Sequence, residues 1–176
     1  YTVATTGIPA PTLSATGVPA WLNFNTTTGE LSGTPAAADI GTTGQIMFTA
    51  SNGIGTDATQ QFTITVDGVP PAITSTAPVT ATVGIAYSYT VAVSGIPTPN
   101  LSTNTLPTWL TFNATTGELS GTPAVGDIGL STQIDISAAN GWGTPAVQSF
   151  QIQVNGVVPI ITSTAPTTAL ASVMYS

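Results

Sequence analysis

The chain repeats itself once over its whole length, with a period of 88 residues. Tyr1-Thr2-Val3-Ala4 recurs as Tyr89-Thr90-Val91-Ala92, so the 176 residues are two whole periods. Pairing each residue i with residue i+88 gives 53 identical positions and 35 differences among 88 pairs. One repeat is one structural unit, so the fold of 88 residues determines the architecture. Both ends read as the middle of a strand, and we therefore expect a segment of a longer array.

The composition excludes several classes of function. The chain has no Lys, Arg, His or Cys, a net charge of -7, and only 4% charged residues, against about a quarter in ordinary soluble domains. Without cationic side chains the chain cannot bind phosphate groups electrostatically, which excludes nucleic-acid binding. It also has no polybasic segment that anionic membranes would attract. No apolar run approaches the roughly 20 residues that span a bilayer, so we expect no membrane insertion in this segment.

The apolar residues alternate with period two. Phe62–Val66 and its copy Phe150–Val154 place large apolar side chains on one face and polar side chains on the other, which is typical of half-buried strands. Ile46–Ala50 and Ile134–Ala138 predict a second strand, and Tyr89–Val93 predicts a third. Short strands separated by Gly and Pro indicate an all-β sandwich.

Turn residues agree with this interpretation. Asn25–Gly29 and Asn113–Gly117 join two apolar runs and end in a Gly suited to positive φ, which predicts a tight hairpin. Val69-Pro70-Pro71 joins one repeat to the next without a Gly/Ser spacer. A short junction stiffened by Pro predicts neighbouring units placed end to end with limited freedom.

Three strings that recur in both copies carry a family resemblance. They are Pro19–Asn25, Thr28–Pro35 and Asp39–Gly41 in the first copy, and Pro107–Asn113, Thr116–Pro123 and Asp127–Gly129 in the second. These strings resemble the immunoglobulin-like repeat that is also called the dystroglycan-type cadherin-like domain. The resemblance implies tandem seven-stranded sandwiches of very large prokaryotic surface and secreted proteins, which act as stalks, adhesin shafts or matrix fibres. The expected fold class is therefore all-β, with Ig-like (cadherin-like) β-sandwich repeats of 88 residues arranged head to tail.

In this family frame we expect three parts. Residues 1–68 form a sandwich that lacks its leading strand region, residues 69–156 form a complete sandwich, and residues 157–176 are the leading strand region of a following repeat. A sandwich without an edge strand exposes unpaired N–H and C=O groups and part of its core. The expected partners are identical repeats or subunits, head to tail, either by continuation of the chain or by donor-strand exchange between subunits.

Five carboxylates are candidates for a calcium site: Glu30, Asp39, Asp67, Glu118 and Asp127. Calcium needs six to eight oxygen ligands and usually several converging carboxylates. The acidic clusters of cadherins are missing, and Asp67 is replaced by Asn155 in the second copy. The favoured interpretation is that Asp39 and Asp127 bind backbone N–H groups in a turn after Gly-Thr-Pro, with no cofactor and Ca²⁺ only as the alternative.

The tryptophans divide into two kinds. Trp21 and Trp109 lie in apolar strings and are expected in the core, with the indole N–H bound to the backbone. Trp142 replaces Ile54 between two glycines of a loop, and is the candidate interaction residue. We expect it to pack on a neighbouring unit, with glycan or receptor binding as the alternative. Asn25, Asn100 and Asn113 match the N-glycosylation pattern, which arises easily by chance in a chain rich in Ser and Thr.

The function expected from these residues is structural. Without His, Lys, Cys or Arg, only a carboxylate pair could perform acid–base chemistry, and the acids belong to repeated turns, so we expect no enzyme. We expect a repeat segment of an extracellular fibre, filament or adhesin stalk, located outside the cell or at its surface. The alternative is an adhesive module of a cell-surface protein that binds carbohydrate or protein.

Overall fold

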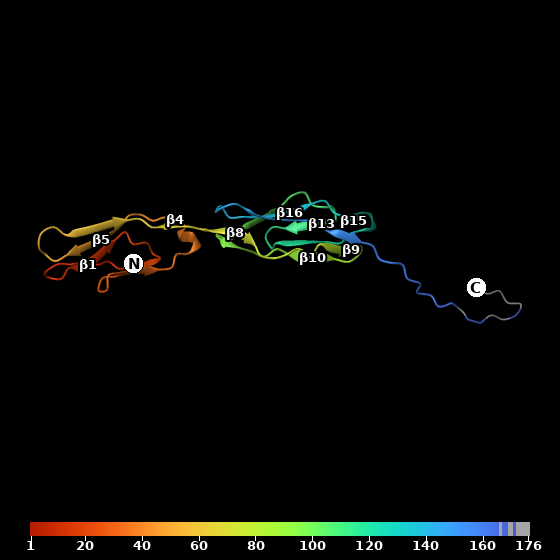
Figure 1. Cartoon of the computed structure of the whole chain (residues 1–176), viewed down its shortest axis with the longest axis horizontal. Coiled ribbons are helices and arrows are strands. Elements are labelled where there is room, and N and C mark those ends of the chain that lie inside the picture. The colour runs from red at the N-terminus through yellow and green to blue at the C-terminus, as the bar shows by residue number, and fades with distance from the viewer. Residues whose placement is uncertain (166, 169–170, 172–176) are drawn as a thin grey trace. The chain divides into compact units, whose positions relative to one another are not determined.

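The computed structural model describes residues 1–165, 167–168 and 171, and the regular secondary structure of these residues is nearly all β (Figure 1). The elements of the first repeat are β1 (Thr12–Thr16), β2 (Leu22–Asn25), β3 (Glu30–Gly33), the 3-10 turn η1 (Ala37–Asp39), β4 (Gly41–Thr42), β5 (Ile46–Ser51), β6 (Ala58–Phe62) and β7 (Thr65–Val66). Those from residue 69 onward are β8 (Val69–Ile73), β9 (Thr80–Thr82), β10 (Tyr87–Thr90), β11 (Val93–Ile96), β12 (Asn100–Thr103), β13 (Leu110–Asn113), β14 (Glu118–Gly121), η2 (Val125–Asp127), β15 (Gly129–Leu130), β16 (Ile134–Ala139), β17 (Ala146–Phe150) and β18 (Gln153–Asn155).

The same elements recur at the same positions of both repeats. β2, β3, η1, β4, β5 and β6 lie 88 residues before β13, β14, η2, β15, β16 and β17, with identical lengths. The all-β, Ig-like fold class expected from the sequence is confirmed. Because equivalent residues occupy equivalent elements, each residue of one repeat has a structural counterpart in the other.

Two compact units are distinguished within the chain. The first contains residues 1–75, 91–102 and 136–148, and the second contains residues 76–90, 103–135 and 149–176. The first unit includes the sheets β2–β3, β4–β7, β1–β5–β6 and β8–β11, all antiparallel. Leu31, Ile46 and Phe48 are the buried centre of its first-repeat core. The domain boundaries expected from the sequence stay a prediction.

The second unit contains two three-stranded sheets. Their strand orders are β10–β14–β13, which is antiparallel throughout, and β15–β18–β9, in which β9 runs parallel to β18. A further sheet of the second repeat has the order β12–β16–β17. The side chains of Leu119, Ile134, Ile136, Ala138 and Ile152 are 0% exposed, which confirms the inward face expected from the period-two pattern.

The predicted hairpin joins β2 to β3 and recurs between β13 and β14. The Asn25 side-chain oxygen accepts the backbone N–H groups of Thr27 and Thr28 at 2.9 and 3.1 Å, and Gly29 has φ +72°. The backbone N–H of Gly29 also donates to the Asn25 carbonyl at 2.8 Å. A short amide side chain at the start and a glycine at the end are what this turn needs, so local sequence predicts it.

Three runs expected as strands are interrupted: Phe62–Val66, its copy Phe150–Val154, and Tyr89–Val93. The run Phe62–Val66 is divided between β6, which pairs with β5, and β7, which pairs with β4. Ile64 lies at the break, where its N–H donates to the Thr43 hydroxyl at 2.9 Å. The run Tyr89–Val93 is likewise divided between β10 and β11, which pair with β14 and β8. One extended run can thus contribute strands to two sheets. The alternation of apolar and polar residues does not show where the run changes its pairing partner.

Trp21 and Trp109 are half-buried, so the expectation that they belong to the closed core is only partly met. The Trp109 ring meets the Tyr87 ring edge to face, with 5.9 Å between centroids. Tyr87 is the more enclosed of the pair, at 6% exposure. The Trp109 indole therefore lies at the margin of the core, as its size and polar N–H favour.

Tyr87 is expected to make the stability of the second unit depend on alkaline pH. Its hydroxyl donates to the Pro78 carbonyl at 2.8 Å, and burial, with a smaller contribution from Tyr89, raises the pKa of its phenol from 10.0 to about 12. The folded chain therefore holds this proton more tightly than the unfolded chain. The stabilisation is complete below about pH 10 and is lost as pH rises through about 12. Denaturant midpoints measured across this range should fall, and the fall should be shallower in Tyr87→Phe; equal slopes would contradict the assignment.

Candidate functional site: an open groove and sheet edge in the first repeat

The second repeat shows how the leading segment of a repeat is bound. The backbone N–H of Thr74 donates to the Ala92 carbonyl at 2.8 Å, and the backbone N–H of Ala92 donates to the Ser75 hydroxyl at 2.8 Å. The Gln148 side-chain amide donates to the Ser75 carbonyl at 2.7 Å. Ala77, two residues later, is only 6% exposed. The segment is therefore held by its backbone and by the Ser75 hydroxyl, and it inserts a small apolar side chain into the core.

Asn140 fixes the start of the same segment. Its side-chain amide donates to the carbonyl oxygens of Val69 and Pro97, both at 2.8 Å. β8 then pairs with β11, with Ile73 opposite Val93. One amide group thus ties the first residue of β8 to the turn after β11.

Tyr89 and Val91 are buried in the second repeat, and their counterparts in the first repeat are more exposed. Tyr1 is 65% exposed, whereas its counterpart Tyr89 is 7% exposed. Val3 is half-buried, whereas Val91 is 6% exposed. More of the apolar surface of Tyr1 and Val3 is therefore in contact with water than that of Tyr89 and Val91.

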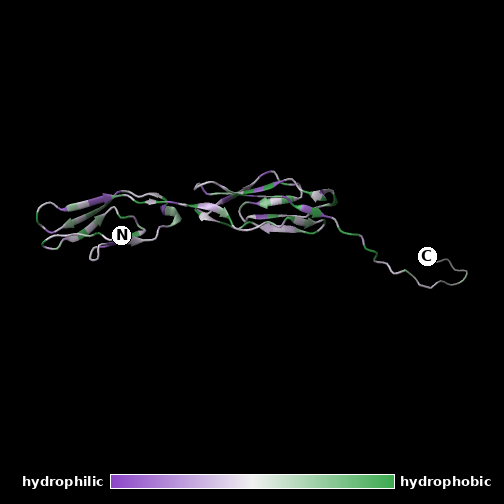
Figure 2. Cartoon of the chain, in the orientation of Figure 1, coloured by the Kyte–Doolittle hydropathy of each residue, from purple (hydrophilic) through white to green (hydrophobic). Residues whose placement is uncertain are grey.

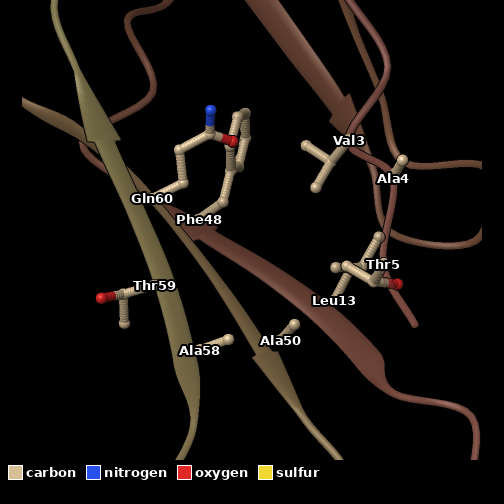
Figure 3. A pocket seen from close by; sticks show the side chains of 9 residues that line it. All are labelled: Val3, Ala4, Thr5, Leu13, Phe48, Ala50, Ala58, Thr59 and Gln60. Carbon is tan, nitrogen blue, oxygen red and sulfur yellow. The ribbon is translucent and has the colours of Figure 1, made fainter. Parts of the chain in front are cut away.

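The exposed face is hollowed into a groove, which we call the first-repeat groove. A hollow of about 130 Å³ is lined by Val3, Ala4, Thr5, Leu13, Phe48, Ala50, Ala58, Thr59 and Gln60. Figure 3 shows Val3, Leu13, Ala50 and Ala58 pointing into a common space. A second hollow of about 340 Å³ shares Ala4, Thr5, Ala50 and Ala58 and extends to Thr6, Pro11, Asn52 and Thr56. The groove therefore combines an apolar floor with polar groups along its rim.

Two polar side chains of the rim correspond to the residues that hold the leading segment in the second repeat. Gln60, the counterpart of Gln148, accepts a hydrogen bond from the Tyr1 hydroxyl at 3.0 Å. Asn52, the counterpart of Asn140, donates to the Pro9 carbonyl at 3.1 Å. Asn52 thus keeps the hydrogen bond that Asn140 makes to the corresponding Pro97 carbonyl, whereas the second acceptor of Asn140 is the Val69 carbonyl of the leading segment.

The candidate metal ligands are placed separately. The carboxylates of Asp39 and Asp127 each accept a backbone N–H within their own 3-10 turn, from Ala36 and Ala124, at 2.8 Å. This is the backbone interaction expected from the sequence. Glu118 accepts the Ser88 hydroxyl at 3.3 Å, and Glu30 and Asp67 are exposed. Among the residues that the structure describes, no three acidic or other metal-ligating side chains form a group.

We expect a calcium chelator to leave the melting temperature unchanged. The Asp39 and Asp127 carboxylates already bind backbone N–H groups, and a calcium site needs more converging oxygens than either turn offers. Calorimetry with EDTA, then with excess Ca²⁺, measures this directly. A lower melting temperature in EDTA that Ca²⁺ restores would instead support a cadherin-like junction.

Trp142 lies against the start of the second repeat. Its backbone N–H donates to the Asn140 side-chain oxygen at 3.1 Å, and a Cβ added at Gly68 would overlap its indole ring. Neighbouring Gly143 approaches Pro70, since a Cβ there would lie 3.1 Å from the Pro70 ring. The half-buried indole therefore packs on the segment that enters β8. Interaction of Trp142 with another molecule stays a prediction.

The candidate glycosylation sites occupy two kinds of position. Asn25 and Asn113 begin the hairpin turns, where their side-chain oxygens accept backbone N–H groups. Asn100 is exposed at the first position of β12. All three are accessible on the surface, and modification at any of them stays a prediction.

Residue types alone did not single out the groove. Val3, Ala4, Leu13 and Gln60 are ordinary strand residues without unusual chemistry. The counterparts of Ala4 and Gln60, which are Ala92 and Gln148, bind the leading segment, so comparison of position i with i+88 could have identified these two residues once the hydrogen bonds were known. The sequence predicted an open edge but not the residues that line it.

Comparison with known proteins identifies the repeats. A family model described as Putative Ig domain matches residues 1–67 and again residues 70–155. A search of the curated proteins finds no match.

Several solved structures resemble the chain. Immunoglobulin domains 1–5 of Sidekick-1 match with a TM-score of 0.44 and 19% identity, over 85% of this chain and 34% of that one. Extracellular domains 3–5 of Drosophila OTK match with a TM-score of 0.43 and 18% identity, over 85% and 53%. An endo-fucoidan hydrolase of glycoside hydrolase family 107 matches with a TM-score of 0.38 and 25% identity, over 85% and 24%. The chain spans less than two thirds of each of these solved chains.

Proposed function

The chain belongs to the Putative Ig domain family, and on that premise we propose that it is a structural segment of an extracellular fibre, filament or adhesin stalk. The segment would be built from Ig-like domains joined head to tail. Tandem Ig-like domains are typical of extracellular adhesion or structural segments. The observation that carries the proposal is the recurrence of six elements, β2, β3, η1, β4, β5 and β6, as β13, β14, η2, β15, β16 and β17 at a spacing of 88 residues.

The connection between the repeats supports a structural role. β7 ends at Val66 and β8 begins at Val69, so only Asp67 and Gly68 separate them. Asn140 binds the Val69 carbonyl, and Trp142 packs on Gly68. A connection this short, with its second half held by side chains, has little of the freedom of a flexible linker.

The surface chemistry also suits a structural role. With no Lys or Arg, the chain has no side-chain ion pairs that salt could weaken. The sheets therefore depend on backbone hydrogen bonds and apolar contacts. The Ig-like fold is typical of non-enzymatic modules. The adhesive alternative relied on Trp142 as an exposed platform, but its indole is half-buried against Gly68.

We also propose an extracellular or cell-surface location, on the basis of the family. Ig-like domains are typical of such proteins. In the described part of the chain the helical elements are the three-residue turns η1 and η2, and no helix there could cross a bilayer.

The test is to locate the protein on the cells that make it. An antibody raised against residues 1–176, used for immunogold electron microscopy, should label filaments or stalks along their length. A second arm measures binding of the same chain to a glycan array and to host-cell surfaces. Labelling confined to the cytoplasm would contradict the proposal, and specific binding to one glycan without labelled filaments would favour the adhesive module.

A further inference from the structure

The side chain of Asn140 uses all of its hydrogen-bonding groups within the fold. Its amide nitrogen donates to the carbonyl oxygens of Val69 and Pro97, both at 2.8 Å, and its oxygen accepts the backbone N–H of Trp142 at 3.1 Å. Hydrophilic and hydrophobic residues are interspersed along the strands of both repeats (Figure 2), and the chain has no cationic side chain. Its polar contacts therefore depend on neutral groups, such as this amide.

We call Asn140 and its two carbonyl acceptors the amide clasp. The clasp lies at the end of the β8–β11 pairing, where the register shifts between Ser94 and Ile96. A Cβ added at Gly95, within this irregularity, would lie 2.9 Å from the amide nitrogen of Asn140. The sheet therefore leaves room for the amide only because residue 95 has no side chain.

The clasp residue is followed by a glycine that the turn requires. Asn140 directly follows β16, and Gly141 has φ +83°, a left-handed conformation that glycine adopts without steric cost. Gly141 is exposed, and a Cβ there would meet nothing within 4 Å. The fold thus places an asparagine before an unhindered glycine, at a position that water can reach.

An asparagine before a glycine can lose its amide without any enzyme. The backbone nitrogen of Gly141 attacks the side-chain carbonyl carbon of Asn140 and forms a new C–N bond, while the bond to the amide nitrogen breaks. That nitrogen takes the Gly141 proton and leaves as ammonia, and the product is a cyclic imide. Water then opens the ring at either carbonyl and gives aspartate or isoaspartate. Asparagine is a thermolabile residue for this reason.

We propose that Asn140 is a site of spontaneous deamidation, which the closed amide clasp prevents and which opening of the clasp permits. In the closed state the departing nitrogen is held by Val69 and Pro97, and the Trp142 N–H fixes the carbonyl oxygen. The side chain must leave these partners before its carbon can turn toward the Gly141 nitrogen. The reaction therefore proceeds through the fraction of molecules in which this part of the chain is locally open.

Deamidation makes the opening irreversible. An ionised carboxylate only accepts hydrogen bonds, so at position 140 it would face the carbonyl oxygens of Val69 and Pro97 without a proton to donate. The isoaspartate product also adds one methylene group to the main chain of the turn. Neither product can close the clasp again, and the first residue of β8 loses its tie to the turn after β11.

Peptide mass spectrometry of the whole chain, incubated in native buffer or in guanidinium chloride, tests the protection. Pepsin digestion is needed because the chain has no Lys or Arg for trypsin. We expect Asn140 to react at least about tenfold more slowly in the native chain, because an open state populated below about one tenth limits the rate. Asn52 and Asn155, which also precede glycines, are internal standards in the denatured chain. Equal native and denatured rates, or an Asn140 that stays intact in denaturant while the standards react, would overturn the proposal.

Gly95→Ala opens the clasp without changing the reactive pair. The added Cβ would displace the amide of Asn140, so we expect deamidation in native buffer to accelerate toward the denatured rate. Gly41→Ala is the matched control in the same unit, since Gly41 has a similar φ of +127° but a Cβ there meets nothing within 4 Å. The same native rate at Asn140 in both variants would show that the clasp does not control the reaction.

Asn140→Asp tests the consequence directly, because it introduces the aspartate product in every molecule. We expect amide hydrogen exchange in β8 to accelerate at least about tenfold, since two hydrogen bonds to its attachment are lost. Asn100→Asp adds the same charge at an exposed position of the same unit and should leave this exchange unchanged. Equal exchange in the two variants would mean that charge alone acts, and that deamidation does not release β8.

Discussion

Replacing Phe48 with Ala is expected to lower the free energy of unfolding of the first unit by about 3–5 kcal/mol, the usual effect of removing a buried aromatic ring. Phe48 is 2% exposed, and its ring centroid lies 4.7 Å from that of Phe24 and 5.3 Å from that of Phe62. It also stacks on Tyr1 at 6.2 Å. Truncation would remove three ring contacts at once and enlarge the first-repeat groove, which Phe48 itself lines. Hydrogen exchange of peptides from residues 1–66 in increasing denaturant measures the effect on this unit alone.

The second repeat supplies the control for this variant. Its residue at the equivalent position is Ile136, which is 0% exposed. Phe48→Ile therefore places a natural side chain among the same neighbouring residue types, and we expect it to destabilise the unit by less than Phe48→Ala. An equal loss from both variants would show that ring shape, rather than buried volume, stabilises this core. No loss from Phe48→Ala would contradict the assignment of Phe48 to the core.

The parts of the fold that depend on local chemistry could be predicted from the sequence. The Asn25 and Asn113 turns form because an amide side chain binds the backbone two and three residues ahead, within one short string. The 3-10 turns at Asp39 and Asp127 form for a similar reason, with a carboxylate that binds a backbone N–H three residues before it. Interactions that close within four residues leave a readable pattern.

The parts that depend on distant partners could not be predicted. Alternation shows that Ile64 and Ile152 face inward, but it does not show that the strand changes sheets beside them. Ser75 gives no sign in the sequence that its carbonyl binds Gln148, 73 residues later. The groove has the same origin, because its lining comes from residues 3–5, β1, β5 and β6 together. The repeat made these long-range relations transferable from one copy to the other, but only the structure supplied them.

Gly121→Ala is expected to destabilise the second unit by about 3 kcal/mol or more, at the upper end of overpacking effects. Gly121 ends β14, the central strand of its sheet, where it pairs with Leu110 on one side and Tyr87 on the other. A Cβ at this position would overlap the carbonyl oxygen of Trp109, which is backbone and cannot rotate away. The added methyl group must therefore separate β13 from β14 or displace the chain at Trp109. Loss of protection in peptides that cover residues 110–121 would measure this effect.

Gly126→Ala is the matched control, because a Cβ at Gly126 would meet nothing within 4 Å. Its counterpart in the first repeat is already Ala38, whereas the counterpart of Gly121 is again a glycine, Gly33, with the same close approach to Trp21. We therefore expect Gly126→Ala to leave stability unchanged or slightly raised, since alanine restricts the unfolded chain. Gly33→Ala should reproduce the loss in the first unit. If Gly121→Ala and Gly126→Ala behaved alike, the close packing of β13 against β14 would be wrong, and the glycine shared by both repeats would need another explanation.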